Sequence, residues 1–318
     1  MKKLFYILCF FILFEIFCRY VIGLGNPIIL KRHPSIEYEL VPNQKVNRFH
    51  RQIKINSEGM RSDDLKIIKD PKDIRVLIFG DSIIWGGSLI SQNNLGTELL
   101  REKKFNNRSL EIANISAGSW GPGNWLAFIN ERGLYDADIV ILVISSHDWN
   151  DSPDFLYRNF IEKKPFTATN EFFMRYLFPK INTSFQNLKS LYRRNSNPLN
   201  KNISAKEIGN IKGKGLDDLS EFIDFVKESK AKLAIVQFWD KEEFIYETPK
   251  KGNLLIKKVI KEKNIPNIQS VDNFKKCSNN HKDLFTDSIH PFTKLGQKCL
   301  SETIFDAIKL TNDIPQKY

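Results

Sequence analysis

The sequence predicts an α/β protein in which helices cover both faces of a parallel sheet. From residue 74 onward, short apolar runs rich in Val and Ile alternate with longer amphipathic segments. The runs carry apolar side chains at successive positions, which is typical of parallel strands buried on both faces. This alternation favours a layered α/β architecture over an all-β or all-α fold.

The expected elements follow in chain order. Strands are expected at the apolar runs 74–79, 110–116, 139–145, 233–238 and 268–271. Helices are expected where apolar residues recur at helical spacing, at 95–104, 216–227, 254–263 and 294–310. We assign the main domain to residues 74–318, which is long enough to bury one large core.

The N-terminal stretch 4–24 predicts a membrane anchor, assigned to residues 1–25. It follows the basic Lys2 and Lys3, and its only charges are Glu15 and Arg19. The stretch is long enough to span the hydrocarbon core of a bilayer as a helix. Four residues apart, Glu15 and Arg19 lie on one helix face and can pair.

Retention of this helix is favoured over cleavage, because no alanine precedes Ala113 and an A-x-A-like signal-peptidase site is absent. The positive-inside tendency then places the rest of the chain outside the cytoplasm, in the periplasm or at the cell surface. The competing interpretation is a buried amphipathic helix in a cytoplasmic protein.

Two further segments differ from the main pattern. Residues 26–73 contain short alternating pieces and are expected to form a lead-in segment packed on the main domain. Residues 150–215 are too long for an ordinary connection and are expected to form an insertion beside the active site. Aromatic side chains there either stack on sugar rings or form a local core: Phe155, Tyr157, Phe160, Phe166, Phe172, Phe173 and Tyr176.

The charge of +11 comes from dispersed Lys and Arg, without a long basic block or a nucleic-acid-binding motif. We therefore expect a solvated basic surface and no nucleic-acid partner. The five His are scattered and no Cys pair has zinc-ligand spacing, so neither a metal nor a cofactor is expected. Cys277 and Cys299 either form a disulfide in an oxidising compartment or remain core thiols.

The first candidate for chemistry is Ser82, which follows the expected strand 74–79 directly. The carboxyl end of a buried strand holds a nucleophile rigidly while loops surround it. Gly80 permits a tight turn before Asp81 and Ser82, and a helix beginning after Ser82 directs its amides towards a developing oxyanion.

The second candidate is the Asp287–His290 pair near the C-terminus, followed by Pro291. A serine needs a neutral imidazole to take its proton, and that imidazole needs an acceptor that fixes its tautomer. Asp287, three residues before His290, can supply the acceptor. The alternative is that Asp287 caps a turn and His290 is a surface residue.

The two motifs together resemble those of the SGNH (GDSL-like) hydrolases. The first block of that family is matched by Gly80-Asp81-Ser82 and its last block by Asp287, His290 and Pro291. The resemblance spans roughly 74–310 and implies a flavodoxin-like three-layer α/β/α sandwich. It also implies that Ser82 is the nucleophile, His290 the base and Asp287 the partner of His290.

The resemblance implies an oxyanion hole as well, formed by the amides of Ser82 and Gly118 and by a third donor. Gly118 follows the expected strand 110–116. The third block departs from the family pattern G-x-N-D, because the strand 139–145 is followed by Ser146-His147-Asp148. Position at the strand end favours His147 as the third donor, and matching the letters favours Asn150.

The lead-in segment also resembles that of anchored SGNH proteins associated with bacterial surface-polysaccharide synthesis, at residues 36–40, 42–44 and 56–61. We therefore expect a serine esterase that removes an O-acyl group, O-acetyl being favoured, from an extracytoplasmic glycan. The expected partners are this glycan, the membrane and polysaccharide-synthesis proteins. The alternatives are an O-acyltransferase on the same glycans, a catalytically silent glycan-binding or assembly protein, and a lipid esterase or thioesterase.

Overall fold

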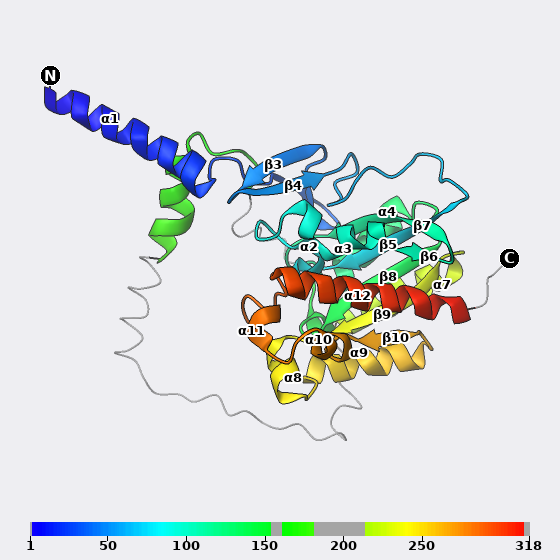
Figure 1. The fold of residues 1–318 in the computed structure, drawn as a ribbon. Coiled ribbons are helices and arrows are strands. Elements are labelled where there is room, and N and C mark those ends of the chain that lie inside the picture. Colours follow the sequence, from blue (N-terminus) through cyan, green and yellow to red (C-terminus); the bar gives the residue numbers. More distant parts are fainter. Residues whose placement is uncertain (1, 154–160, 181–213, 315–318) are drawn as a thin grey trace.

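The structure, a computed structural model, describes residues 2–153, 161–180 and 214–314 (Figure 1). Its main sheet has the strand order β10-β9-β8-β5-β7-β6, and all neighbours are parallel except the edge hairpin β6–β7. The strands are β5 (Asp73–Gly80), β6 (Lys104–Phe105), β7 (Arg108–Ser116), β8 (Ile139–Ser145), β9 (Lys232–Phe238) and β10 (Asn267–Gln269). Without β6, this is the flavodoxin-like order 2-1-3-4-5, which confirms the predicted fold class.

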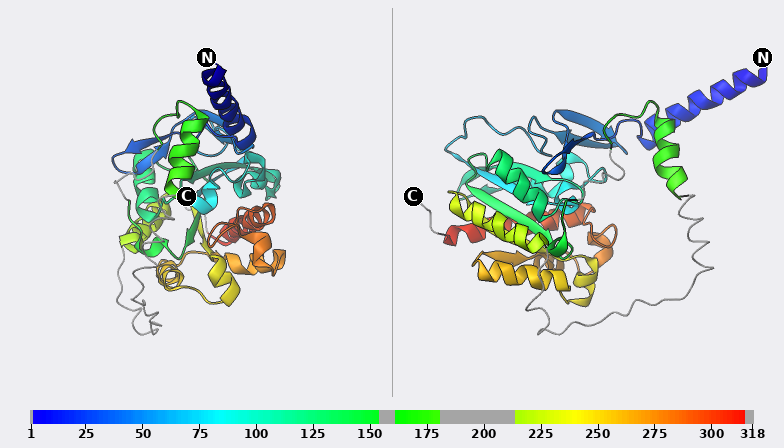
Figure 2. Two further views of the ribbon diagram at one scale, coloured as in Figure 1. Left: turned by 90° about the vertical axis from the view of Figure 1, so that its left-hand side faces the viewer. Right: turned by 180° about the vertical axis from the view of Figure 1, so that it is seen from behind.

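Helices cover both faces of this sheet (Figures 1 and 2). One layer contains α4 (Pro122–Arg132), α7 (Lys214–Glu228) and α9 (Lys251–Glu262). The other contains α10 (Ser270–Cys277) and α12 (Lys294–Leu310). Along β5, Leu77 and Phe79 belong to the first core and Val76 and Ile78 to the second, as the alternation of side chains in a strand requires.

Short helices connect the layers at the carboxyl ends of the strands. They are α2 (Ser82–Trp85), α3 (Gly96–Leu99), α8 (Lys241–Tyr246) and α11 (His281–Leu284). The helix expected at 95–104 is shorter than predicted, because α3 passes into a 3-10 turn (Leu100–Glu102) and then into β6. The α3 start is fixed from far away, since the Gly96 amide donates to Gln297 Oε1 at 2.7 Å.

The lead-in segment forms two antiparallel hairpins on the main domain, β1 (Leu30–His33) with β2 (Glu37–Leu40) and β3 (Gln44–Arg48) with β4 (Arg51–Ile55). Ile36 and Met60 enter the core beneath α4 and α7. Arg61, fully buried, follows the hairpins and donates to the carbonyl oxygens of Trp85, Gly87 and Ile90. The lead-in therefore holds the loop that follows α2.

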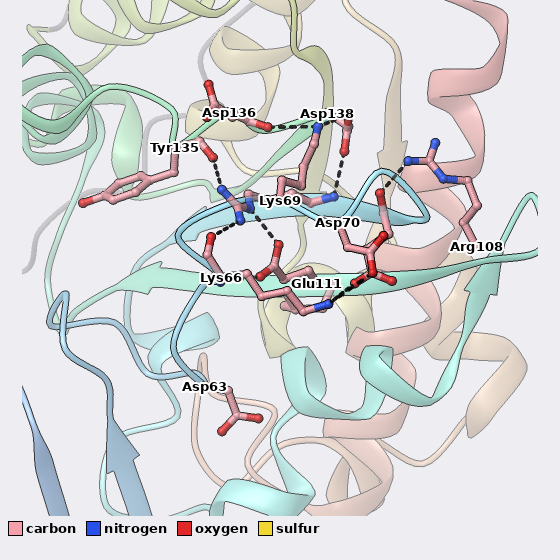
Figure 3. Close-up of polar contacts among 12 residues, drawn as sticks. Asp63, Lys66, Lys69, Asp70, Arg108, Glu111, Tyr135, Asp136 and Asp138 are labelled. Carbon is pink, nitrogen blue, oxygen red and sulfur yellow. Dashed lines mark hydrogen bonds and ion pairs between the residues drawn. The ribbon is translucent and has the colours of Figure 1, made fainter.

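At the amino end of the sheet, a closed set of polar bonds joins the lead-in to the strands (Figure 3). Arg75, only 3% exposed, donates to Glu111 Oε2 at 2.7 Å. Its guanidinium also donates to the carbonyl oxygens of Tyr135 and Lys66, both at 2.6 Å. Its amide donates to Asp138 Oδ2 at 2.8 Å. The guanidinium is thus bonded by one buried carboxylate and two backbone carbonyl oxygens.

The N-terminal helix α1 (Lys2–Ile16) continues as a π-helix, η1 (Phe17–Ile22), and projects away from the sheet (Figures 1 and 2). The helical segment Lys2–Ile22 has the length and apolar composition needed to cross a membrane. A signal sequence has the same two properties. The expected pairing is present, with Arg19 Nη2 lying 2.7 Å from Glu15 Oε1.

The described part of the expected insertion packs next to this helix. It contains α5 (Ala168–Glu171) and its π-helical continuation η5 (Phe172–Leu177). Phe172 and Tyr176 belong to a small core with residues of α1, η1 and the β3–β4 turn, so they form local core. The expected aromatics Phe155, Tyr157 and Phe160 lie outside the described residues.

Candidate active site

Ser82 occupies the first position of α2, directly after β5, at the carboxyl edge of the sheet. Gly80 must lack a side chain, because a Cβ there would lie 2.6 Å from Ile84 Cγ1. Trp125 Nε1 donates to the Gly80 carbonyl oxygen at 3.1 Å, and Asp81 Oδ1 accepts from the Ile83 amide at 2.8 Å. These bonds fix the strand-to-helix turn that carries the Ser82 hydroxyl.

His290 reaches Ser82 from the far end of the chain. Its Nε2 lies 2.9 Å from Ser82 Oγ, and its Nδ1 lies 2.7 Å from Asp287 Oδ2. The ring of Phe292 stacks on the imidazole with centroids 4.6 Å apart, and the His290 carbonyl accepts from the Thr286 amide. The structure therefore brings together all three residues of the expected triad, with the imidazole between hydroxyl and carboxylate.

The carboxylate of Asp287 is kept ionised by the loop that carries it. Partial burial acts to raise its pKa, but hydrogen bonds from the amides of His290 and Ile289, both at 2.8 Å, and from the imidazole outweigh that effect. The pKa of Asp287 is therefore lowered from its ordinary value of 3.8. An ionised acceptor holds the Nδ1–H tautomer of His290, which leaves Nε2 free to accept a proton from Ser82.

The amides of Ser82 and Gly118, which follow the adjacent parallel strands β5 and β7 at the carboxyl edge of the sheet, are available as oxyanion donors. In the part of the chain that the structure describes, neither the Ser82 amide nor the Gly118 amide donates a hydrogen bond. Gly118 lies in the turn after β7, and its carbonyl oxygen accepts from the Tyr38 hydroxyl. This hydroxyl therefore fixes the peptide that carries one of the two expected donors.

His147 lies at the end of β8 and is bonded on both sides of its ring. Its Nε2 lies 2.9 Å from Asp81 Oδ2, and its Nδ1 lies 2.8 Å from Ser145 Oγ. Asp148, buried beneath it, accepts from the Ser145 amide at 2.7 Å. The carboxyl ends of β5 and β8 flank the point where the strand order reverses, which is the usual ligand site of such sheets.

The charge state of His147 follows from these neighbours. Burial acts to lower its pKa, but the carboxylates of Asp148 and Asp81 outweigh burial and raise the pKa to about 10. His147 is then an imidazolium at neutral pH, and both nitrogens donate. Its use as the third oxyanion donor would require one of these two hydrogen bonds to break. Asn150 lies exposed at the end of the following 3-10 turn (Asp148–Asn150).

Sequence reasoning missed three side chains that shape this site: Tyr38, Asp81 as the acceptor of His147, and Ser145. Asp81 carried a visible signal, because it stands inside the Gly-Asp-Ser tripeptide beside the expected nucleophile. Burial, helped by the carboxylates of Glu37 and Asp81, raises the pKa of Tyr38, so its hydroxyl remains a donor. Nothing local in the lead-in indicates that Tyr38 meets Gly118.

One group of potential metal ligands exists among the described residues. The ligand atoms of Asp81, His147 and Asp148 lie within 4.8 Å of one another. The Asp81 carboxylate and the His147 ring already bond each other, and a metal would have to displace the His147 proton. We therefore assign these residues to positioning of the turn before Ser82.

No protein-family profile and no curated protein matches this sequence. Among solved structures, the chain is similar to a lipase/acylhydrolase from Enterococcus faecalis, at 14% identity over 77% of this chain and 99% of that one, with a TM-score of 0.42. It is also similar to a catalytic mutant of an acetylxylan esterase from Geobacillus stearothermophilus, at 12% identity over 76% and 96%, with a TM-score of 0.42.

A third similar structure is a member of the lipolytic G-D-S-L family from Veillonella parvula, at 12% identity over 74% of this chain and 98% of that one, with a TM-score of 0.41. The fold assignment rests on the strand order of the sheet, and the chemistry rests on the contacts of Ser82.

Proposed function

We propose that this protein is a membrane-anchored serine esterase of the SGNH type that removes O-acyl groups, O-acetyl above all, from an extracytoplasmic glycan. The observation that carries the proposal is the continuous contact from Ser82 Oγ through the His290 imidazole to the Asp287 carboxylate. Residues 208 positions apart in the chain meet in the order that nucleophilic ester cleavage requires.

In the proposed reaction, Ser82 Oγ attacks the ester carbonyl while His290 Nε2 takes the hydroxyl proton. The amides of Ser82 and Gly118 stabilise the oxyanion, and the imidazolium formed on His290 is stabilised by Asp287. His290 then protonates the leaving sugar oxygen, which leaves an acyl group on Ser82. Water, deprotonated by His290, attacks this acyl-enzyme and restores the free serine.

The catalytic side chains are partly exposed to solvent, which supports a large substrate. The side chain of Asp287 is 48% exposed and that of His290 is 25% exposed. An ester that projects from a polymer can approach such a site from solvent, whereas a long acyl chain needs an apolar channel to leave water. The resemblance of the lead-in to anchored polysaccharide-associated proteins supports the same substrate class and suggests polysaccharide-synthesis proteins as partners.

Two features support a location outside the cytoplasm. The N-terminal helix has the length and composition of a membrane span. Cys277 and Cys299, on α10 and α12, are bonded to each other, and structural disulfides are typical of oxidising compartments. The bond closes the segment that contains both Asp287 and His290.

The test is active-site labelling and ester cleavage by the full chain in detergent micelles. Wild type should react with a fluorophosphonate probe and release acetate from an O-acetylated polysaccharide. Ser82→Ala should do neither, while Ser288→Ala, which removes a neighbouring exposed serine, should behave as wild type. Folded wild type that takes up no probe would refute the esterase and favour the silent glycan-binding protein.

Hydrolysis and acyl transfer share the same acyl-enzyme, so a second measurement separates them. A soluble sugar acceptor is added to the reaction, and acetate and acetylated sugar are both quantified. The esterase should give acetate as the main product at every acceptor concentration. Near-complete conversion to acetylated sugar would favour the O-acyltransferase.

A further inference from the structure

We infer that the helix formed by α5 and η5, residues 168–177, is a second membrane-embedded element that lies beside α1 among the lipid acyl chains. The contact between the two helices carries the inference. The ring of Phe14 lies 5.6 Å from that of Phe172 and 6.0 Å from that of Phe173, measured between centroids. Figures 1 and 2 show the α5–η5 helix against the domain-proximal end of the N-terminal helix.

The depth of this contact follows from helix length. Residues 2–22 make a span of 21 residues, which is about 30 Å at about 1.5 Å per residue and matches the hydrocarbon core. Phe14 lies about 12 Å along the axis from the end of that span, eight residues away. If α5–η5 were outside the hydrocarbon, only residues 2–13 would remain, about 18 Å, which is too short to cross.

The charges in the anchor point to the same arrangement. A carboxylate inside a bilayer is costly unless it is paired. Glu15 Oε1 accepts from the Ala168 amide at 3.0 Å, and Glu15 Oε2 accepts from the Thr169 amide at 2.8 Å. Arg19 completes the pairing. The start of α5 therefore supplies the donors that an embedded Glu15 requires.

Away from α1, the α5–η5 region exposes large apolar side chains beside the polar Asn170. Phe166 is 96% exposed, Met174 60% and Phe178 52%, and the exposed apolar residues of α1 range from 47% (Ile16) to 72% (Leu4). Lys163 and Lys164, both exposed, precede this region and can reach lipid headgroups. Exposure of these apolar side chains to water is unfavourable. Lipid acyl chains would cover them, and anionic headgroups would bind the two lysines.

The test places an environment-sensitive NBD fluorophore on single cysteines in the full chain, with Cys9 and Cys18 replaced by alanine. Met174→Cys and Phe178→Cys report on α5–η5. Phe10→Cys, in the middle of α1, is the positive control, and Ile67→Cys, which is fully exposed at the opposite end of the sheet, is the negative control. The proteins are reconstituted into vesicles of phosphatidylcholine and phosphatidylglycerol, with or without nitroxide-labelled acyl chains.

The expected result is blue-shifted emission and strong nitroxide quenching at positions 10, 174 and 178, and neither at position 67. Quenching at position 10 without quenching at 174 and 178 would overturn the inference and leave the anchor intact. No quenching at position 10 would overturn both. None of these variants touches Ser82 or His290, so ester cleavage by the same vesicles tests the proposed function separately.

Discussion

The two ends of the same parallel sheet use charged groups in opposite ways. At the amino end, the Arg75 guanidinium is buried and every bond it makes is to Glu111 or to a backbone oxygen. At the carboxyl end, the side chains of Asp287 and His290 are 48% and 25% exposed. The comparison shows two uses of charged side chains. A buried charge whose partners all lie within the protein contributes to stability, whereas a partly exposed charge can contact a reactant.

The sharpest test of this comparison is Ser82→Ala. The change should lower kcat/KM for an acetyl ester by about 10⁵-fold, because the proposed acyl-enzyme forms on the Ser82 hydroxyl. The free energy of unfolding should change by less than about 0.5 kcal/mol, since the hydroxyl contributes little to the core. Hydrolysis of p-nitrophenyl acetate and urea unfolding measure the two effects. A large loss of stability in Ser82→Ala would contradict the inference that the carboxyl end of the sheet serves activity and the amino end serves stability.

Asp287→Asn should lower kcat/KM by about 10³-fold, because an amide does not hold the required His290 tautomer or stabilise the imidazolium. Asp272→Asn, an exposed acid on α10, is the matched control and should retain the wild-type rate. The measurement is the rate of p-nitrophenyl acetate hydrolysis at pH 7.5. Equal rates for the two variants would remove Asp287 from the proposed mechanism.

At the amino end, Arg75→Met should lower the free energy of unfolding by about 3 kcal/mol, because Glu111 Oε2 and two carbonyl oxygens lose their donor and the Glu111 carboxylate keeps only the Lys66 amide. The rate per folded molecule should stay at the wild-type value. Lys66→Met, in which the replaced side chain is 53% exposed, should cost less than about 1 kcal/mol. Urea unfolding measures the free energy of unfolding of both variants, and kcat is measured on the folded fraction. A loss of kcat in Arg75→Met would contradict the comparison.

The smallest effect is expected at His147, where the pH dependence of stability is informative. Its pKa is raised from 6.5 to about 10 in the folded state, so its stabilising contribution is fully present below about pH 6.5 and is lost as pH rises through about 10. Melting temperatures between pH 6 and pH 10.5 should therefore fall more steeply for wild type than for His147→Asn. Parallel curves would show that the imidazolium contributes nothing to folding.

The strands and the triad could be predicted from the sequence because both depend on short-range signals. An apolar run marks a buried strand, and Ser82 at its end must lie at the carboxyl edge that all parallel strands share. His290 precedes the last long helix, whose start lies at the same edge. Long-range contacts gave no such signal: Gln297 bonds the amide at the start of α3, and Asp81 holds the His147 ring.

Burial of charge was equally hard to predict. Arg75 stands at the start of a strand, where an arginine is usually exposed, and its burial depends on Lys66 and Tyr135 from two separate loops. The contact of α5 with Glu15 joins segments 153 residues apart, without a periodic pattern that marks it. A sequence pattern indicates the structure of its own segment. The burial of Arg75 and the contact of α5 with Glu15 each depend on how separate segments pack together.

The Arg61 guanidinium has a practical consequence for shortened versions of this protein. A recombinant chain that began at residue 73 would contain every strand of the main sheet, yet the carbonyl oxygens of Trp85, Gly87 and Ile90 would lose their donor. Tyr38 would also no longer hold Gly118. A recombinant chain without the anchor should therefore start before Ile28, the first residue of the lead-in that is buried with Trp85.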